Sequence, residues 1–71
     1  MKYVVVELQT DANGNVANLV TQHDTRGEAD SKYHAVLSAA AISTLPVHAA
    51  ILMDNYGLVY AQGRYTPEDR Q

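Results

Sequence analysis

The chain has no cysteine, tryptophan or phenylalanine, and only two of its 71 residues are proline. Without thiols, it can form neither disulfides nor thiolate metal sites, and cysteine usage says nothing about the redox compartment. No apolar run is long enough to span a bilayer, and Met1 and Lys2 lead directly into a strand pattern instead of a signal-peptide core. We therefore expect a cytoplasmic location and no membrane partner.

Basic charge is also scarce. The chain has five Lys and Arg residues and eight Asp and Glu residues, which gives a net charge of −3. The basic residues are scattered along the chain as Lys2, Arg26, Lys32, Arg64 and Arg70. Nucleic-acid binding needs a concentrated positive surface, so the composition argues against a nucleic-acid partner. That interpretation would change only if an oligomer gathered Arg64 or Lys32 from several copies.

The length predicts one small domain that benefits from a partner. A chain of this size buries only about 60% of the surface that its unfolded form exposes. Because disulfides are excluded, self-association is the remaining common source of stability. We expect a single α+β domain over residues 1–66, a flexible polar tail over residues 67–71, and a homo-oligomer of two or more copies.

One helix organises the predicted fold. Residues 25–43 begin with Thr25 and Glu28 at the spacing of a capping box, and Pro46 forces the chain out of helical geometry soon after Ser43. Six apolar residues recur at helical spacing and predict the face that packs on a sheet: Ala29, Tyr33, Val36, Leu37, Ala40 and Ala41.

Three further apolar residues, Ala35, Ala39 and Ile42, lie off this stripe. One interpretation is that alanine is a strong helix former that tolerates exposure. The other is that small side chains let a second backbone approach the helix closely. Both interpretations stay open from the sequence.

Four segments have the pattern of strands: residues 3–9, 16–23, 46–53 and 58–65. Asn13 and Gly14 predict a hairpin turn between the first two, and residues 54–57 predict another between the last two. Gly63 indicates a bulge or a close backbone approach. The order predicts a ββαββ fold, a four-stranded antiparallel sheet with one helix packed on one face.

One face of this sheet has no cover in a monomer. We expect an uncovered patch formed by Val5, Val20, Ala50, Leu52 and Tyr60, although a register slip of one residue would exchange the two faces. Exposed apolar patches usually mark a partner surface. The favoured assembly is a homodimer or a larger ring.

No catalytic motif is present in the sequence. The spacing of His34 and His48 matches no metal-ligand motif, the serines of the helix lack a nucleophile elbow, and the four glycines are isolated. We therefore expect no enzyme activity, no catalytic residue, no metal and no cofactor. His34 is better explained as a partly exposed helix residue than as a ligand.

A binding role requires fewer specific sequence features than catalysis does. Tyr60, Gln62 and Arg64 alternate along the last strand and should share one face. Arg64 between tyrosines can hold a phosphate or carboxylate and stack on a base. The competing interpretation is that the tyrosines cover an edge strand and Arg64 keeps that edge soluble.

Residues 25–57 resemble a group of small, uncharacterised phage- and prophage-encoded proteins, with similar EA-SKYH and LPVHAA blocks at residues 28–34 and 45–50. The resemblance covers about half of the chain. It implies a phage origin, and hence the host cell cytoplasm. The matching positions are Ser31, Lys32, Tyr33, His34, Pro46, Val47 and His48.

Small phage proteins are often virion accessories, inhibitors of host factors, or oligomeric sponges that sequester nucleotide immune signals. The favoured hypothesis is a non-enzymatic oligomer that sequesters a nucleotide-like signalling ligand to counter host defence. The alternatives are an interaction module that inhibits a host protein and a virion accessory protein. The candidate ligand-binding residues are Lys32, Tyr33, His34, His48 and Arg64.

Overall fold

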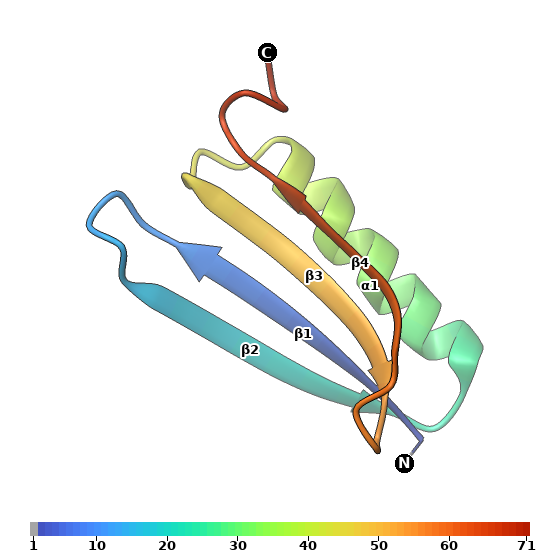
Figure 1. Cartoon of the computed structure of the whole chain (residues 1–71). Coiled ribbons are helices and arrows are strands. Elements are labelled where there is room, and N and C mark those ends of the chain that lie inside the picture. Colours follow the sequence, from blue (N-terminus) through green and yellow to red (C-terminus); the bar gives the residue numbers. More distant parts are fainter. Residues whose placement is uncertain (1) are drawn as a thin grey trace.

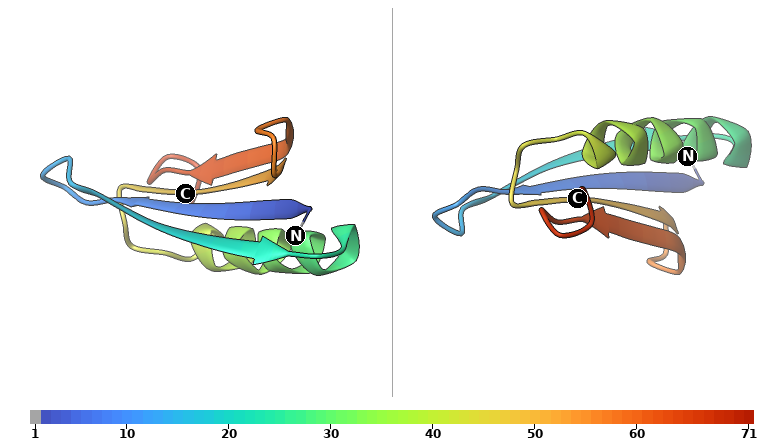
Figure 2. Two further views of the ribbon diagram at one scale, coloured as in Figure 1. Left: turned by 90° about the horizontal axis from the view of Figure 1, so that it is seen from below. Right: turned by 90° about the horizontal axis from the view of Figure 1, so that it is seen from above.

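A computed structural model describes residues 2–71. The elements follow the order β1 (Tyr3–Thr10), β2 (Val16–His23), α1 (Arg26–Ala41), β3 (Val47–Asp54) and β4 (Val59–Tyr65). The strands form one antiparallel sheet in the order β2-β1-β3-β4, and α1 covers one of its faces (Figure 1). Seen along its edge, the sheet has the helix on one side only (Figure 2). The predicted α+β class and element order are confirmed.

The helix begins where the sequence predicts. Thr25 is the N-cap, and its hydroxyl oxygen accepts a hydrogen bond of 3.2 Å from the backbone N–H of Glu28. The same hydroxyl donates to the Glu28 carboxylate at 3.2 Å. These contacts satisfy one of the free amides of the first turn and place negative charge at the positive end of the helix.

Within residues 2–71, no helix is long and apolar enough to cross a membrane.

The chain end lies against the other end of the helix. Arg70 donates hydrogen bonds from its guanidinium to the backbone carbonyls of Ala40, Leu45 and Tyr65, at 3.0, 2.6 and 3.2 Å. One side chain thereby joins the helix end, the loop before β3 and the end of β4. The tail of residues 67–71, which we expect to be flexible, therefore has a specific contact with the domain.

The same pattern of hydrogen bonds to an Asp carboxylate stabilises both hairpin turns. Asp11 Oδ1 accepts hydrogen bonds from the amides two and four residues further along, and Asp54 Oδ1 does the same, all at 2.8 to 2.9 Å. These backbone hydrogen bonds lower the pKa of both carboxyl groups. Gly14 and Gly57 take the left-handed conformation that each turn requires, with φ of 85° and 92°. The turn predictions are confirmed.

The core lies between α1 and one face of the sheet. The buried helix residues belong to the predicted stripe, and Val5, Ala50 and Leu52 pack beneath them. The prediction that these three sheet residues stay uncovered was wrong. The face without a helix instead carries Val4, Val6, Leu8, Val20, Ile51, Met53 and Val59.

Small residues explain which face the helix covers. β1 and β3 carry apolar residues on both faces. The alternation of their side chains therefore does not show which face of the sheet the helix covers. Gly63 lies on the helix side, where a Cβ atom would come within 3.2 Å of the Leu37 side chain. Together with Ala50, it leaves space for α1 to approach. Of the two expectations for Gly63, the close approach is the one found.

The bulge lies elsewhere, where Leu52 and Met53 meet β4. It moves Tyr60 to the helix side, where its ring lies 6.0 Å from the ring of Tyr3 and beneath the guanidinium of Arg26. The prediction that Tyr60 shares a face with Gln62 and Arg64 was therefore wrong. An irregularity that breaks strand alternation has no signature at this point in the sequence.

Candidate functional site

The open face of the sheet, which we define as the face opposite α1, contains a hollow at Ala49. Leu8, Ala49 and Arg64 lie side by side across β1, β3 and β4, and Ile51 and Gln62 lie in the next row. The central residue of the first row has only a methyl side chain, whereas its neighbours are long. The row is therefore low in the middle, and the side chains around it form walls.

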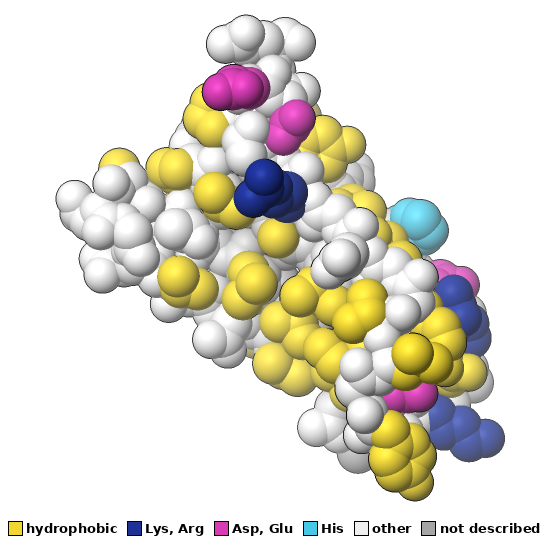
Figure 3. Space-filling view, viewed as in Figure 1, with side chains coloured by type: hydrophobic (Ala, Val, Ile, Leu, Met, Phe, Trp, Pro, Cys, Tyr) yellow, Lys and Arg dark blue, Asp and Glu magenta, His cyan; other side chains and the backbone are white. Residues whose placement is uncertain are grey.

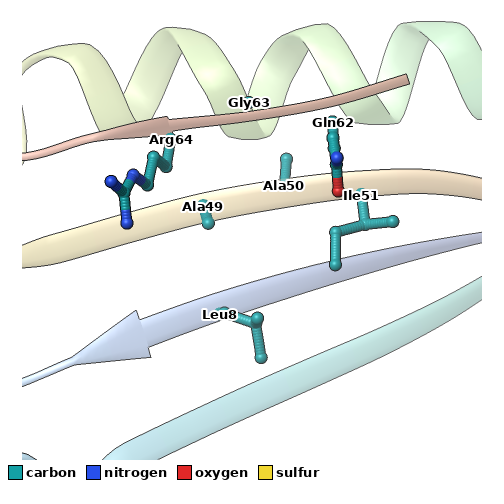
Figure 4. A pocket seen from close by; sticks show the side chains of 7 residues that line it. All are labelled: Leu8, Ala49, Ala50, Ile51, Gln62, Gly63 and Arg64. Carbon is teal, nitrogen blue, oxygen red and sulfur yellow. The ribbon is translucent and has the colours of Figure 1, made fainter.

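This hollow is an open cleft of about 440 Å³. Figure 4 shows Gln62 and Arg64 projecting from β4, with Ile51 and Leu8 on the neighbouring strands. The floor is aliphatic, while one wall carries an amide and a guanidinium. The lining residues are Leu8, Ala49, Ala50, Ile51, Gln62, Gly63 and Arg64.

Arg64 dominates the electrostatics of the open face. Among the described strand residues on this face there is no carboxylate, and Arg64 is the one charged side chain. Figure 3 shows a basic patch surrounded by apolar and uncharged side chains, with acidic groups only beyond it. Within residues 2–71, no hydrogen bond or ion pair holds the Arg64 side chain. Its donors are therefore available to a ligand.

The charge of Arg64 acts on the carboxylate of Asp69. Hydrogen bonds from the amide and hydroxyl of Thr66, both 2.9 Å, lower the pKa of Asp69, and the positive charge of Arg64 lowers it further. The Asp69 carboxylate is thus already engaged by Thr66. It moderates the positive potential at the cleft without forming an ion pair with Arg64.

The cleft has the chemistry to bind an amphipathic anion. An aliphatic floor can pack against a flat apolar group, and the Gln62 amide can donate and accept hydrogen bonds. The Arg64 guanidinium can bind a phosphate or carboxylate through two parallel hydrogen bonds. The volume of the cleft falls within the range of about 300–1,000 Å³ typical of small-molecule sites.

The five predicted site residues do not come together. Tyr33 is buried in the core, His48 is buried between sheet and helix, and Lys32 is half-buried on α1. His34 is exposed on the helix, with its ring edge-on to Tyr33 at 5.3 Å. Arg64 alone lines the cleft, on the opposite side of the sheet from the buried residues.

His48 instead forms a pair with Glu7. Its Nε2 lies 2.6 Å from Glu7 Oε2, and Gln9 Nε2 donates to the same oxygen at 3.2 Å. The hydrogen bond with His48 is the main cause that lowers the pKa of Glu7, and the charge of Lys32 contributes. Because an ionised carboxylate only accepts, Nε2 must carry the proton. The buried Nδ1 has no hydrogen-bond partner within residues 2–71.

The predictions from the sequence missed four side chains of the cleft: Leu8, Ala49, Ile51 and Gln62. They also missed Glu7 as the partner of His48. Leu8 and the Glu7–His48 contact need the pairing of β1 with β3, which are separated along the chain by β2 and α1, whereas Ala49, Ile51 and Gln62 lie on the β3–β4 hairpin. An alanine in a strand flanked by long side chains is the one signal that could have indicated the hollow.

The acidic and histidine side chains of the described residues do not form a metal-binding cluster. Among residues 2–71, no three His, Asp or Glu side chains lie together in an arrangement that could hold a metal ion.

No family model, curated protein or solved structure matches the chain. The interpretation of the site therefore depends on its own geometry and charge.

Proposed function

We propose that the protein is a non-enzymatic, homo-oligomeric binding protein that holds an amphipathic anion on its open sheet face. The observation that carries this proposal is the position of Arg64. Among the described strand residues of this face its guanidinium is the one charge and there is no carboxylate, and it lies beside an aliphatic cleft of about 440 Å³. A free guanidinium beside an apolar floor favours a ligand with a flat apolar part and a phosphate or carboxylate.

A nucleotide fits this description best. Its base would lie on the aliphatic floor at Ala49 and Ile51, with hydrogen bonds to the Gln62 amide and its phosphate at Arg64. Sequestration of a nucleotide signal requires only stoichiometric binding, so no catalytic group is needed. The resemblance of the EA-SKYH and LPVHAA blocks to phage-encoded proteins supports a signal used in host defence as the ligand.

Native mass spectrometry of the protein purified from phage-infected cells with a nucleotide-based defence tests this function. We expect wild type to carry a reproducible nucleotide-sized adduct, which Arg64→Ala loses and Arg64→Lys retains in part. Lys2→Ala is the matched control, because it removes an exposed cation outside the cleft. A bare wild-type protein, or an adduct that survives Arg64→Ala, would overturn the proposal.

A second candidate function is an interaction module that inhibits a host protein. The observation in its favour is that the apolar surface continues past the cleft through Val4, Val6, Met53 and Val59. Such a surface is broader than one nucleotide can cover. A protein ligand would be lost on Met53→Lys, whereas a nucleotide ligand would be lost on Arg64→Ala.

A further inference from the structure

The outer edge of β2 (Val16–His23) lacks the features that usually protect an edge strand. The strand lies at the margin of the sheet, and no strand of residues 2–71 lies beyond it (Figure 1). It contains no charged residue up to Gln22, no proline and no bulge, and it pairs with β1 in continuous register. Its apolar side chains Val16, Leu19 and Val20 are more than half exposed. An edge of this kind favours pairing with another strand.

The opposite edge of the sheet is different. β4 contains the irregularity opposite Leu52 and Met53, and it carries Gly63 and the cation of Arg64. The chain after Tyr65 also turns back to the helix end through Arg70. Bulges, glycines and charges all weaken strand addition. The one edge suited to pairing is therefore β2.

We propose that two copies pair antiparallel through their β2 strands about a two-fold axis and form a continuous eight-stranded sheet. Residues opposite each other in such a sheet must lie on the same face, and an axis through Leu19 or Val20 meets this condition. Either axis overlaps nearly the whole strand, about 24 Å of backbone. Both helices then cover one face, and the two open faces join on the other.

Charge and symmetry favour a second copy as the occupant of this edge. The chain has a net charge of −3, so two copies repel each other overall. The β2 edge avoids that repulsion because the strand contains no Asp, Glu, Lys or Arg. A strand that pairs antiparallel with its own copy is also self-complementary, since each donates and accepts the same backbone hydrogen bonds.

The pairing stands independently of the ligand proposed for the cleft. The cleft lies over β1, β3 and β4, with β1 between its floor on β3 and the outer strand β2. Dimerisation therefore leaves both clefts open on the joined face. A contact through one strand pair falls among the smaller interfaces, below about 1,200 Å² in total, so the dimer should dissociate on dilution.

Sedimentation equilibrium of the ligand-free protein over a wide concentration range tests the pairing. Leu19→Lys places two ammonium groups beside the axis and should give a monomer. Leu58→Lys is the matched control, since Leu58 is 61% exposed in the β3–β4 turn and Leu19 is 54% exposed on β2. We expect a dimer for wild type and Leu58→Lys. Circular dichroism verifies that each variant is folded.

Nuclear Overhauser effects in a mixture of labelled and unlabelled protein give a second, direct readout. We expect contacts between copies at the amides of Leu19 and Val20. A monomeric wild type, or a dimer that Leu19→Lys leaves intact, would overturn the proposal. The proposal would also be overturned if Ala39→Glu were monomeric while Leu19→Lys remained a dimer. The contact between copies would then lie on the exposed face of α1.

Discussion

Nε2 of His48 lies 2.6 Å from Oε2 of Glu7, and this contact connects β3 to β1 on the helix side of the sheet. The His48 side chain is 6% exposed and that of Glu7 is 17% exposed. Removing Glu7 leaves the buried His48 ring without its partner, and removing His48 leaves the Glu7 carboxylate with the longer contact from Gln9. The pair should therefore matter more for stability than an ion pair on the surface.

His48→Ala should lower the free energy of unfolding by about 2 kcal/mol, because it removes the shorter of the two side-chain hydrogen bonds to the Glu7 carboxylate. Urea unfolding at neutral pH measures this loss. The double variant with Glu7→Gln should lose less than the sum of the two single changes. Additive losses would show that the two side chains do not interact in solution.

Stability should fall as the pH drops below 4.5, the unfolded-state pKa of Glu7. The folded pKa of Glu7 is lower, so its contribution is complete above 4.5 and is lost as pH falls through the folded value. Asp11, Asp54 and Asp69 should add to the loss below 3.8. Urea unfolding across this range should give a shallower pH slope for Glu7→Gln, and an unchanged slope would contradict the assignment.

Gly63→Val should destabilise the fold by about 1–3 kcal/mol, since even its Cβ would lie 3.2 Å from Leu37 Cδ2. Thermal unfolding measures the effect. Gly27→Ala is the matched control, because nothing lies within 4 Å of its Cβ position and alanine favours the first turn of α1 by up to about 1 kcal/mol. Equal effects of the two changes would argue against close packing at Gly63.

Arg70→Ala should cost about 1–2 kcal/mol, because three buried or half-buried carbonyls lose their donor. Hydrogen exchange should become faster at the amides of the last turn of α1, near Ala40. Arg70→Lys should recover part of the protection, since an ammonium can reach only some of the three carbonyls. Unchanged exchange in Arg70→Ala would show that residues 67–71 are flexible in solution.

Local signals were sufficient to predict the elements of this fold. Thr25 and Glu28 predicted the helix start, Asn13-Gly14 and residues 54–57 predicted both turns, and the order of elements predicted the sheet. The helix start and both turns depend on residues close together in sequence, and each strand has its own alternating pattern. That is why the boundaries agree with the structure to within one or two residues.

The sheet faces and the site depend on long-range pairing instead. Val4 and Val5 are equally apolar, so only the tertiary contacts of Gly63 and Ala50 decide which of them α1 covers. Tyr60 was misplaced because the bulge that turns it is a property of two strands together. His48 was considered as a ligand because its partner Glu7 is 41 residues away in the sequence.

The most direct test of the central claim is an amide NMR titration of wild type and Arg64→Ala with purine mononucleotides and cyclic dinucleotides. We predict chemical shift changes in wild type that are centred on Leu8, Ala49, Ile51 and Gln62, and their loss in Arg64→Ala. Changes centred on α1, or no change with any of these nucleotides, would contradict a nucleotide site on the open sheet face.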